Sequence, residues 1–270
     1  MRGTLTEHRI NGKECTVYLP HSYSVQTGAV PCVYVLDGGS LFLEQMDKLE
    51  SQFANGTLPE LIFIGIKPAD RLDEYTPWPA PSLSPAFHDF GGKGRLFLEE
   101  LTDAIIPTVE DMYHISAHPE TRGLIGASLG GLFSIYAMLQ KPEIFGRIGC
   151  ISGSFWYEKS TEYVRSASLR PARRRIYMSV GSREAEHKNN IQNTMIRQNQ
   201  DVHESLRQKG FSQSQLSFTV EEGTVHHQEA FKRQFNAALR WLYGKKTAHV
   251  AERFFSYFIT TGLSSKRLSK

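Results

Sequence analysis

Residues 126–130, GASLG, match the pattern G-x-S-x-G. In enzymes this pattern forms a sharp turn between a strand and a helix, where only small residues fit beside a serine whose hydroxyl is held outward. An apolar run over 123–128 precedes the turn and an amphipathic pattern over 128–141 follows it. We therefore predict that Ser128 is a nucleophile. A serine N-cap is the alternative, and the two are compatible because a helix N-terminus also stabilises negative charge.

A serine hydroxyl becomes a strong nucleophile only when a nearby base takes its proton. Enzymes built around this turn supply an acid and then a histidine later in the chain. His226 and His227 lie between the last predicted strand, residues 216–223, and the last large helical pattern, residues 229–244. Either histidine could be the base, and the alternative is a pair of polar loop or helix-capping residues.

The acid is expected just after the preceding strand, residues 175–181. Glu184 and Glu186 follow that strand directly. A carboxylate there would accept the N–H of the imidazole, fix its tautomer and stabilise the imidazolium. Solvated loop glutamates are the alternative, so the residues alone leave the choice between Glu184 and Glu186 open.

Acyl transfer also needs two backbone N–H groups directed at the developing oxyanion. We expect one from Leu129, the residue after the serine. The second should come from the loop after an early strand, where Gly38, Gly39 and Ser40 follow one another. Glycines let a backbone approach a ligand closely, and we expect Gly39 to be this donor. An ordinary Asp-Gly turn is the alternative.

Apolar, β-rich segments alternate with helical patterns along the chain. Several of the strand segments are too uniformly apolar to have a solvent face, which indicates parallel strands covered on both sides by helices. The strand segments are 15–20, 32–39, 61–66, 123–128, 148–153, 175–181 and 216–223, and the helical patterns are 94–113, 128–141 and 229–244. This alternation predicts a parallel α/β sheet.

Two segments do not follow this alternation. Residues 67–94 are rich in proline and glycine and longer than a simple connection, so they are predicted to form a functional loop. Residues 245–270 carry an aromatic cluster and a basic end, and they are expected to dock as an extra helix or to mediate oligomer contacts. The catalytic domain is accordingly expected to cover residues 1–244. Nothing in the sequence sets the oligomeric state.

Composition argues against several classes of partner. The 270 residues include 31 basic and 28 acidic ones, a balance that does not favour nucleic acid or an anionic membrane. The chain begins with no signal-peptide pattern and has no run long enough to span a bilayer, so we expect a cytoplasmic protein. Cys15, Cys32 and Cys150 are expected to be buried free thiols.

No cofactor or metal is expected either. His114 and His118 have helical metal spacing, but Pro119 follows them and no third ligand lies nearby in sequence. Residues 91–94, GGKG, lack the Ser or Thr that a phosphate-binding loop carries after its lysine. The acyl transfer expected at Ser128 makes a small-molecule ester the expected partner.

Five motifs together resemble the putative-esterase branch of the α/β-hydrolases, which includes the esterase D type, enterochelin-type siderophore esterases and mycolyl transferases. The motifs are VYVLDGGSLF, IGIKPADRLDEYTPW, GGKGRLFLEELTDAIIP, IGASLGGLFSIYAMLQKPEIFGRIGCISGSFWY and VHHQEAFKRQFNAALRWL. The resemblance runs from about Leu5 to Tyr243. It implies an α/β-hydrolase fold, with a mostly parallel central sheet of about eight strands and helices on both faces.

Within this branch the chain is most similar to siderophore trilactone esterases without a separate N-terminal domain. Their base often stands in a His-x-x-x-x-aromatic arrangement, which favours His226 because Phe231 follows at that spacing. Their acid usually lies two or three residues past the glycine that ends its strand, which favours Glu184 after Gly181. Some members work with an incomplete triad, which would leave Glu184 with little to orient.

The resemblance implies a serine esterase that opens the trilactone of a catecholate siderophore and releases its iron. The alternatives are a general short-chain carboxylesterase or thioesterase of the esterase D type, and a non-catalytic module that binds a siderophore or a protein. Ligands of open parallel sheets bind beyond the carboxyl ends of the strands. Several positive and aromatic side chains are expected at that edge, and they would suit an anionic aromatic ligand. They are Lys67, Arg71, Trp78, Trp156, Tyr157 and Arg183. Arg71 could instead pair with its acidic neighbours Asp70, Asp73 and Glu74.

Overall fold

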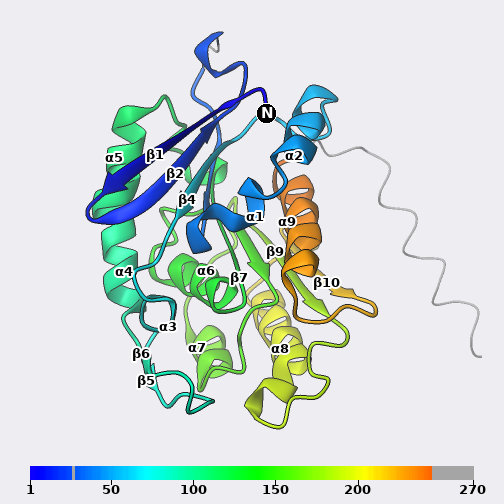
Figure 1. The fold of residues 1–270 in the computed structure, drawn as a ribbon. Helices are drawn as coiled ribbons and strands as arrows, with labels where there is room; N and C mark the ends of the chain where they lie inside the picture. Colours follow the sequence, from blue (N-terminus) through cyan, green and yellow to red (C-terminus); the bar gives the residue numbers. More distant parts are fainter. Residues whose placement is uncertain (26–27, 245–270) are drawn as a thin grey trace, which may run out of the picture.

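The computed structural model describes residues 1–25 and 28–244. One large sheet forms the centre of the fold (Figure 1). Its strand order is β1-β2-β4-β3-β7-β8-β9-β10. The strands are β1 (Thr4–Ile10), β2 (Lys13–Leu19), β3 (Cys32–Val35), β4 (Ile62–Ile66), β7 (Arg122–Ala127), β8 (Arg147–Ile151), β9 (Arg175–Gly181) and β10 (Leu216–Glu221). Strands β3, β4, β7, β8, β9 and β10 run parallel, and β1 and β2 join antiparallel. The prediction of a mostly parallel α/β sheet is confirmed.

Helices cover both faces of this sheet. On one face lie α4 (Gly94–Glu100), α5 (Ile106–Met112), α6 (Leu129–Gln140), α7 (Ser160–Ser166) and α8 (Met195–Gln208); on the other lie α1 (Ser40–Leu43), α2 (Met46–Ala54) and α9 (Gln228–Tyr243). An apolar cluster fills the space between the sheet and the helices on each face. Along β3, Tyr34 packs into the cluster on the α6 face, and Val33 and Val35 pack into the cluster on the α9 face. Both faces of the strand are therefore buried, which explains its continuous apolar sequence.

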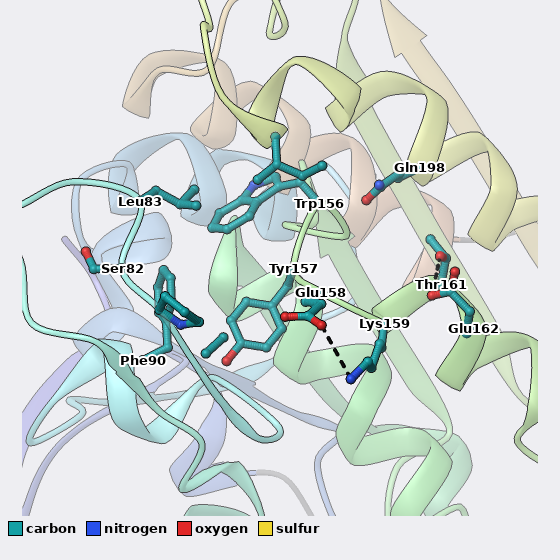
Figure 2. Close-up of a pocket in the computed structure, with 13 residues that line it drawn as sticks. Ser82, Leu83, Phe90, Trp156, Tyr157, Glu158, Lys159, Thr161, Glu162 and Gln198 are labelled. Atoms are coloured by element: carbon teal, nitrogen blue, oxygen red, sulfur yellow. Dashed lines mark hydrogen bonds and ion pairs between the residues drawn. The ribbon is translucent and has the colours of Figure 1, made fainter.

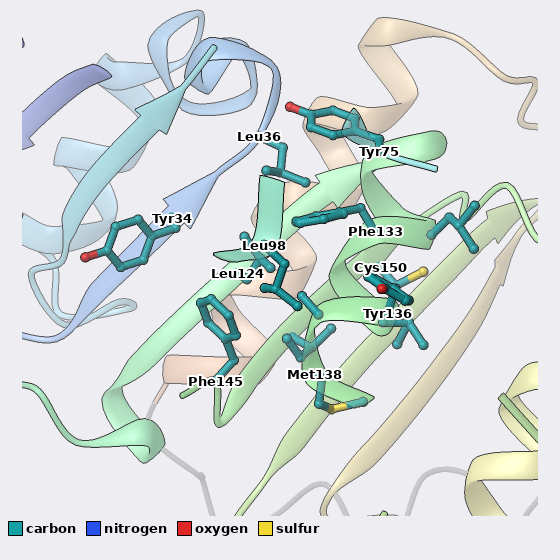
Figure 3. Close-up of a cluster of buried hydrophobic side chains, with 14 of the residues drawn as sticks. Tyr34, Leu36, Tyr75, Leu98, Leu124, Phe133, Tyr136, Met138, Phe145 and Cys150 are labelled. Atoms are coloured by element: carbon teal, nitrogen blue, oxygen red, sulfur yellow. The ribbon is translucent and has the colours of Figure 1, made fainter. Parts of the chain in front are cut away.

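The larger apolar cluster lies between α6 and the sheet (Figure 3). Leu124 of β7 and Phe133 of α6 are both fully buried in it, and the ring of Tyr75 stacks on that of Phe133 with centroids 5.7 Å apart. This close packing fixes the positions of strand β7 and helix α6. It therefore also fixes the turn between them, which carries Ser128.

The segment 67–94 is an arm over the carboxyl ends of the strands. It contains helix α3 (Arg71–Glu74) and a two-stranded sheet of β5 (Pro79–Ala80) and β6 (Phe90–Gly91). The apolar part of the arm packs inward: Phe90 is 6% exposed and Tyr75 is fully buried. Leu83 and Phe90 are among the side chains of the arm that line two neighbouring cavities, the larger of which is drawn in Figure 2.

Several elements differ from the sequence prediction. Strand β1 was not predicted, because its side chains alternate between exposed and half-buried instead of forming an apolar run. The predicted strand 32–39 ends at Val35, and Asp37–Gly39 form a 3-10 turn. The predicted helix 94–113 is continuous but contains a π-helical segment at Leu101–Ile105. The expectation for 245–270 lies outside the described residues.

Two further expectations concern burial and membranes. Cys15, Cys32 and Cys150 are free and buried, as predicted, and burial raises the pKa of the Cys15 thiol to about 11. Such thiols are protonated and unreactive at neutral pH. Among the described residues, no helix combines the length and the apolar character needed to cross a membrane.

Candidate active site

Ser128 lies in a strained turn between β7 and α6. Its backbone angles are φ 58° and ψ −118°, a conformation that costs a residue with a side chain about 1–3 kcal/mol. A Cβ on Gly126 would lie 2.5 Å from the carbonyl of Gly130, so this position requires glycine. Hydrogen bonds hold the turn: the Ser128 N–H donates to Ile151 at 2.9 Å, and its carbonyl accepts from Ser154 at 3.0 Å. The predicted sharp turn is present.

The serine hydroxyl faces a histidine that lies 98 residues later in the sequence. The Oγ of Ser128 and the Nε2 of His226 are 3.0 Å apart, and the Nδ1 of His226 lies 2.8 Å from Oε2 of Glu184. His226 comes from the loop between β10 and α9, and Glu184 follows β9. When the Nδ1–H of His226 donates a hydrogen bond to the carboxylate, Nε2 carries no proton and can accept one from the serine hydroxyl. This arrangement can take a proton from Ser128 and stabilise the imidazolium that results.

Glu184 is fixed by its own contacts. It is 2% exposed, and its Oε1 accepts the N–H of Gly181 at 2.7 Å and the hydroxyl of Ser152 at 2.6 Å. A buried carboxylate needs such donors, because desolvation without them is costly. Glu186 is exposed and bonded to Arg183, and this hydrogen bond lowers the pKa of Glu186. The structure therefore brings Glu184, and not Glu186, to His226.

The two adjacent histidines have separate contacts. The ring of His226 packs edge-on against Phe231, with centroids 4.7 Å apart and an interplanar angle of 79°. His227 is the N-cap of α9, and its Nδ1 accepts the N–H of Glu229 at 3.2 Å. The capping role that the sequence offered for both histidines belongs to His227 alone.

We expect the substitution His227→Ala to lower the free energy of unfolding by about 1 kcal/mol and to leave kcat close to the wild-type value. The reason is that the change removes a helix cap and leaves the hydroxyl and carboxylate partners of His226 in place. Urea unfolding and ester hydrolysis by the same preparation measure both quantities. A large loss of kcat at unchanged stability would mean that His227 takes part in the reaction.

The loop after β3 was expected to supply the second oxyanion donor, and its backbone N–H groups have different partners. The N–H of Gly39 donates to the Leu36 carbonyl at 3.2 Å, and the N–H of Asp37 donates to the Tyr75 hydroxyl at 2.9 Å. Because the N–H of Gly39 is engaged within the turn, this geometry favours Gly38 over the expected Gly39 as the second donor. Among the described residues, the N–H groups of Gly38 and Leu129 have no acceptor, which leaves both able to donate to a substrate oxygen.

Arg71 connects this loop to the serine turn. Its Nε donates to Oδ1 of Asp37 at 2.7 Å, and its Nη2 donates to the carbonyl of Ala127 at 3.0 Å. Asp37 has φ 56°, a left-handed conformation that needs support from its surroundings. The acidic neighbours of Arg71 have other partners: Asp70 binds His88, Asp73 binds Lys93 and Glu74 binds Lys13. The pairing with these neighbours that the sequence offered as an alternative is absent from the described residues.

Beside Ser128 lies a pocket of about 230 Å³. Arg71 and Trp156 line it, together with further side chains of the arm and with Asn190 and Gln192. Of the other predicted substrate residues, Tyr157 is 2% exposed and donates its hydroxyl to the Trp78 carbonyl. Arg183 pairs with Glu186 and is absent from the lining of this pocket. The geometry therefore supports Arg71 and Trp156 as substrate neighbours more than Tyr157 or Arg183.

Sequence reasoning missed two serines that touch this site. The hydroxyl of Ser154 is 3.1 Å from that of Ser128, and Ser152 binds Glu184. Their signal was present, since the segment 152–154, SGS, directly follows β8 at the carboxyl edge of the sheet. Lys67, also expected near the ligand, pairs with Glu14 at 2.6 Å.

The chain is similar to known esterases. The model of the family described as "Putative esterase" matches residues 9–242. The chain belongs to this family. Carboxylic ester hydrolysis is the activity this membership carries, so the protein is an ester hydrolase.

Individual relatives agree with this assignment. An uncharacterized protein of Bacillus subtilis, YbbA, is 50% identical over 245 residues, which cover 91% of this chain and 98% of the relative. The siderophore enterobactin esterase of Emericella nidulans is 29% identical over 175 residues, 56% of this chain and 57% of that one. The structure of an IroE-like serine hydrolase from Shewanella oneidensis superposes with a TM-score of 0.71 at 20% identity, over 89% of this chain and 80% of the other. That last likeness establishes the α/β-hydrolase fold.

Proposed function

We propose that the protein is a serine esterase in which Ser128 is the nucleophile, His226 the general base and Glu184 the residue that orients the base. The observation that carries this proposal is the connected pair of hydrogen bonds, 3.0 Å from Ser128 to His226 and 2.8 Å from His226 to Glu184. The catalytic domain in this proposal is residues 1–244, which contain every residue of the site.

The reaction proceeds in two halves. The Oγ of Ser128 attacks the ester carbonyl carbon while its proton moves to Nε2 of His226, and the N–H groups of Leu129 and Gly38 bind the resulting oxyanion. Collapse of the tetrahedral intermediate breaks the bond to the alcohol, which leaves with the proton from Nε2. A water molecule, deprotonated by His226, then attacks the acyl-enzyme and releases the acid and the free serine.

The substrate we propose is the trilactone of a catecholate siderophore, whose opening in the cytoplasm would help to release iron. Support comes from the aromatic surface of Trp156 and from the guanidinium of Arg71 in the pocket beside Ser128, because a catecholate complex is aromatic and anionic. The carboxylate of Asp37 offsets part of the Arg71 charge. The name of the Emericella nidulans relative points the same way.

A direct comparison of substrates tests this choice. We expect kcat/KM for a ferric tricatecholate trilactone to exceed that for p-nitrophenyl acetate by at least about 100-fold, because contacts away from the ester lower the barrier only for the larger substrate. Chromatography of the released acyl serines and absorbance of nitrophenolate measure the two rates. A preference for simple esters or thioesters would instead place the protein with general hydrolases of the esterase D type.

A further inference from the structure

The segment 152–154, SGS, connects the strand that precedes the acid to the turn that carries the nucleophile. The N–H of Ser152 donates to the carbonyl of Ser179 in β9 at 2.7 Å. Two residues later, the N–H of Ser154 donates to the carbonyl of Ser128 at 3.0 Å. Both serines of the segment therefore have fixed backbone positions beside the proposed triad.

Ser152 has a backbone conformation that is unusual for its residue type. Its φ is 48°, in the left-handed region where glycine is the ordinary residue. A residue with a Cβ keeps such a conformation only when its surroundings hold it there. Because Ser152 is fully buried, the contacts of its hydroxyl are part of those surroundings. The backbone at this position favours glycine, and only the side-chain contacts favour serine.

The hydroxyl of Ser152 binds the carboxylate oxygen that the histidine does not use. Oε1 of Glu184 accepts from this hydroxyl at 2.6 Å and from the N–H of Gly181 at 2.7 Å. Oε2 faces Nδ1 of His226 at 2.8 Å. Hydrogen bonds to a charged oxygen are about twice as strong as neutral ones. Two such bonds on Oε1 resist rotation of the carboxylate about its Cγ–Cδ bond, and they keep Oε2 directed at the imidazole.

A second acceptor competes for the proton of the Ser152 hydroxyl. Oε1 of Gln234 lies 3.2 Å from this hydroxyl, and Nε2 of Gln234 donates to Glu221 at 3.0 Å, which fixes the orientation of the amide. The hydroxyl of Ser179 donates to the same amide oxygen at 3.2 Å. Gln234 thus receives a proton from Ser179, and the negative charge of Glu184 makes its carboxylate the stronger acceptor for Ser152.

Ser152 lies outside the substrate site. The linings of the two cavities beside the arm do not include it, and it is fully buried. An effect of its hydroxyl on turnover must therefore pass through the carboxylate of Glu184, and it should leave substrate binding unchanged.

We propose that Ser152 is a positioning residue of the esterase, whose hydroxyl holds the carboxylate of Glu184 in the rotation that receives the Nδ1–H of His226. In this arrangement Nε2 of the histidine stays unprotonated and directed at Ser128. The inference rests on the proposed function, and it adds to the triad a side chain that orients the acid as the acid orients the base.

Two substitutions at this position separate the hydroxyl from the backbone. Ser152→Ala and Ser152→Gly both delete the hydroxyl, and the glycine also relieves the left-handed conformation. We expect both to lower kcat for p-nitrophenyl acetate about 10-fold, as loss of one charge-assisted hydrogen bond predicts, with KM within about twofold of the wild-type value. Urea unfolding should show that the glycine variant is the more stable of the two. Rates are taken per active site, counted by reaction of Ser128 with a fluorophosphonate.

Ser179→Ala is the matched control. It deletes a hydroxyl that is equally buried and that donates to Gln234, with no bond to Glu184 among the described residues. Its kcat should stay within about threefold of the wild-type value. A loss as large as that of Ser152→Ala would mean that the buried serines act only through packing, and it would overturn the inference. Wild-type kcat in both Ser152 variants, or kcat values that follow their stabilities, would overturn it as well.

A measurement without turnover separates this inference from the proposed function. In the Ser128→Ala protein the proton NMR resonance of the His226 Nδ1–H should be sharp, and adding Ser152→Ala should broaden it, because a carboxylate that can rotate leaves this proton to exchange with water. Adding Ser179→Ala should leave the resonance unchanged. A resonance that stays equally sharp with Ser152→Ala would overturn the positioning by Ser152. If the wild-type protein hydrolysed no ester, the proposed function would fail, and the resonance would decide whether Ser152 holds Glu184.

Discussion

The substitution Ser128→Ala is expected to lower kcat for p-nitrophenyl acetate by about a millionfold, to near the uncatalysed rate. The change removes the only protein atom that the proposed mechanism bonds to the acyl carbon, and His226 then has no serine hydroxyl at 3.0 Å to activate. The fold should persist, because the turn is held by backbone hydrogen bonds to Ile151 and Ser154. Single-turnover hydrolysis and circular dichroism measure the two effects.

The neighbouring hydroxyl supplies the matched control. Ser154→Ala deletes an oxygen 3.1 Å from that of Ser128 and leaves the contact with His226 intact, so its effect should be at most about 10-fold. Equal activity of Ser128→Ala and the wild type would remove Ser128 from the mechanism. A wild-type protein that binds a siderophore without turning over any ester would instead favour the binding module.

The parts of the fold that the sequence predicted are those determined by local patterns. Strands such as β4 and β7 are buried on both faces, and their apolar runs could not fit any solvent-exposed element. The same strand order predicted where the acid and the histidine would lie, since the carboxyl ends of parallel strands share one edge of the sheet. Strand β1 was missed because pairing with β2 stabilises it, and its own residues carry little apolar signal.

The oxyanion loop shows why geometry beyond the backbone pattern was not predictable. Gly38 and Gly39 allow the same range of backbone conformations. Which of the two N–H groups is free to donate to a substrate depends on how contacts with distant segments shape the loop. The hydroxyl of Tyr75 accepts a hydrogen bond from the N–H of Asp37. The guanidinium of Arg71, 34 residues later in the sequence, donates to the Asp37 carboxylate. No local pattern records these contacts. The cavity of about 440 Å³ beside the arm likewise joins residues from the arm, from the start of α7 and from α8.

The substitution Glu184→Gln is expected to lower kcat by about 1,000- to 10,000-fold, the second-largest loss among the changes considered. The amide keeps the shape of the side chain and can still accept from the N–H of Gly181 and the hydroxyl of Ser152. It lacks the negative charge that stabilises the imidazolium, and its NH₂ group favours the tautomer of His226 with the proton on Nε2. That tautomer has no lone pair at Nε2 to accept the proton of Ser128.

Glu186→Gln is the matched control, since it makes the same chemical change two residues along the chain in an exposed side chain bonded to Arg183. Its kcat should stay within about threefold of the wild type, as is usual for exposed ion pairs. The ratio of the two kcat values, at equal thermal unfolding midpoints, isolates the contribution of the buried carboxylate. If the two variants had the same activity, the enzyme would work with Ser128 and His226 as a dyad, and burial of Glu184 would serve only to hold the loop after β9.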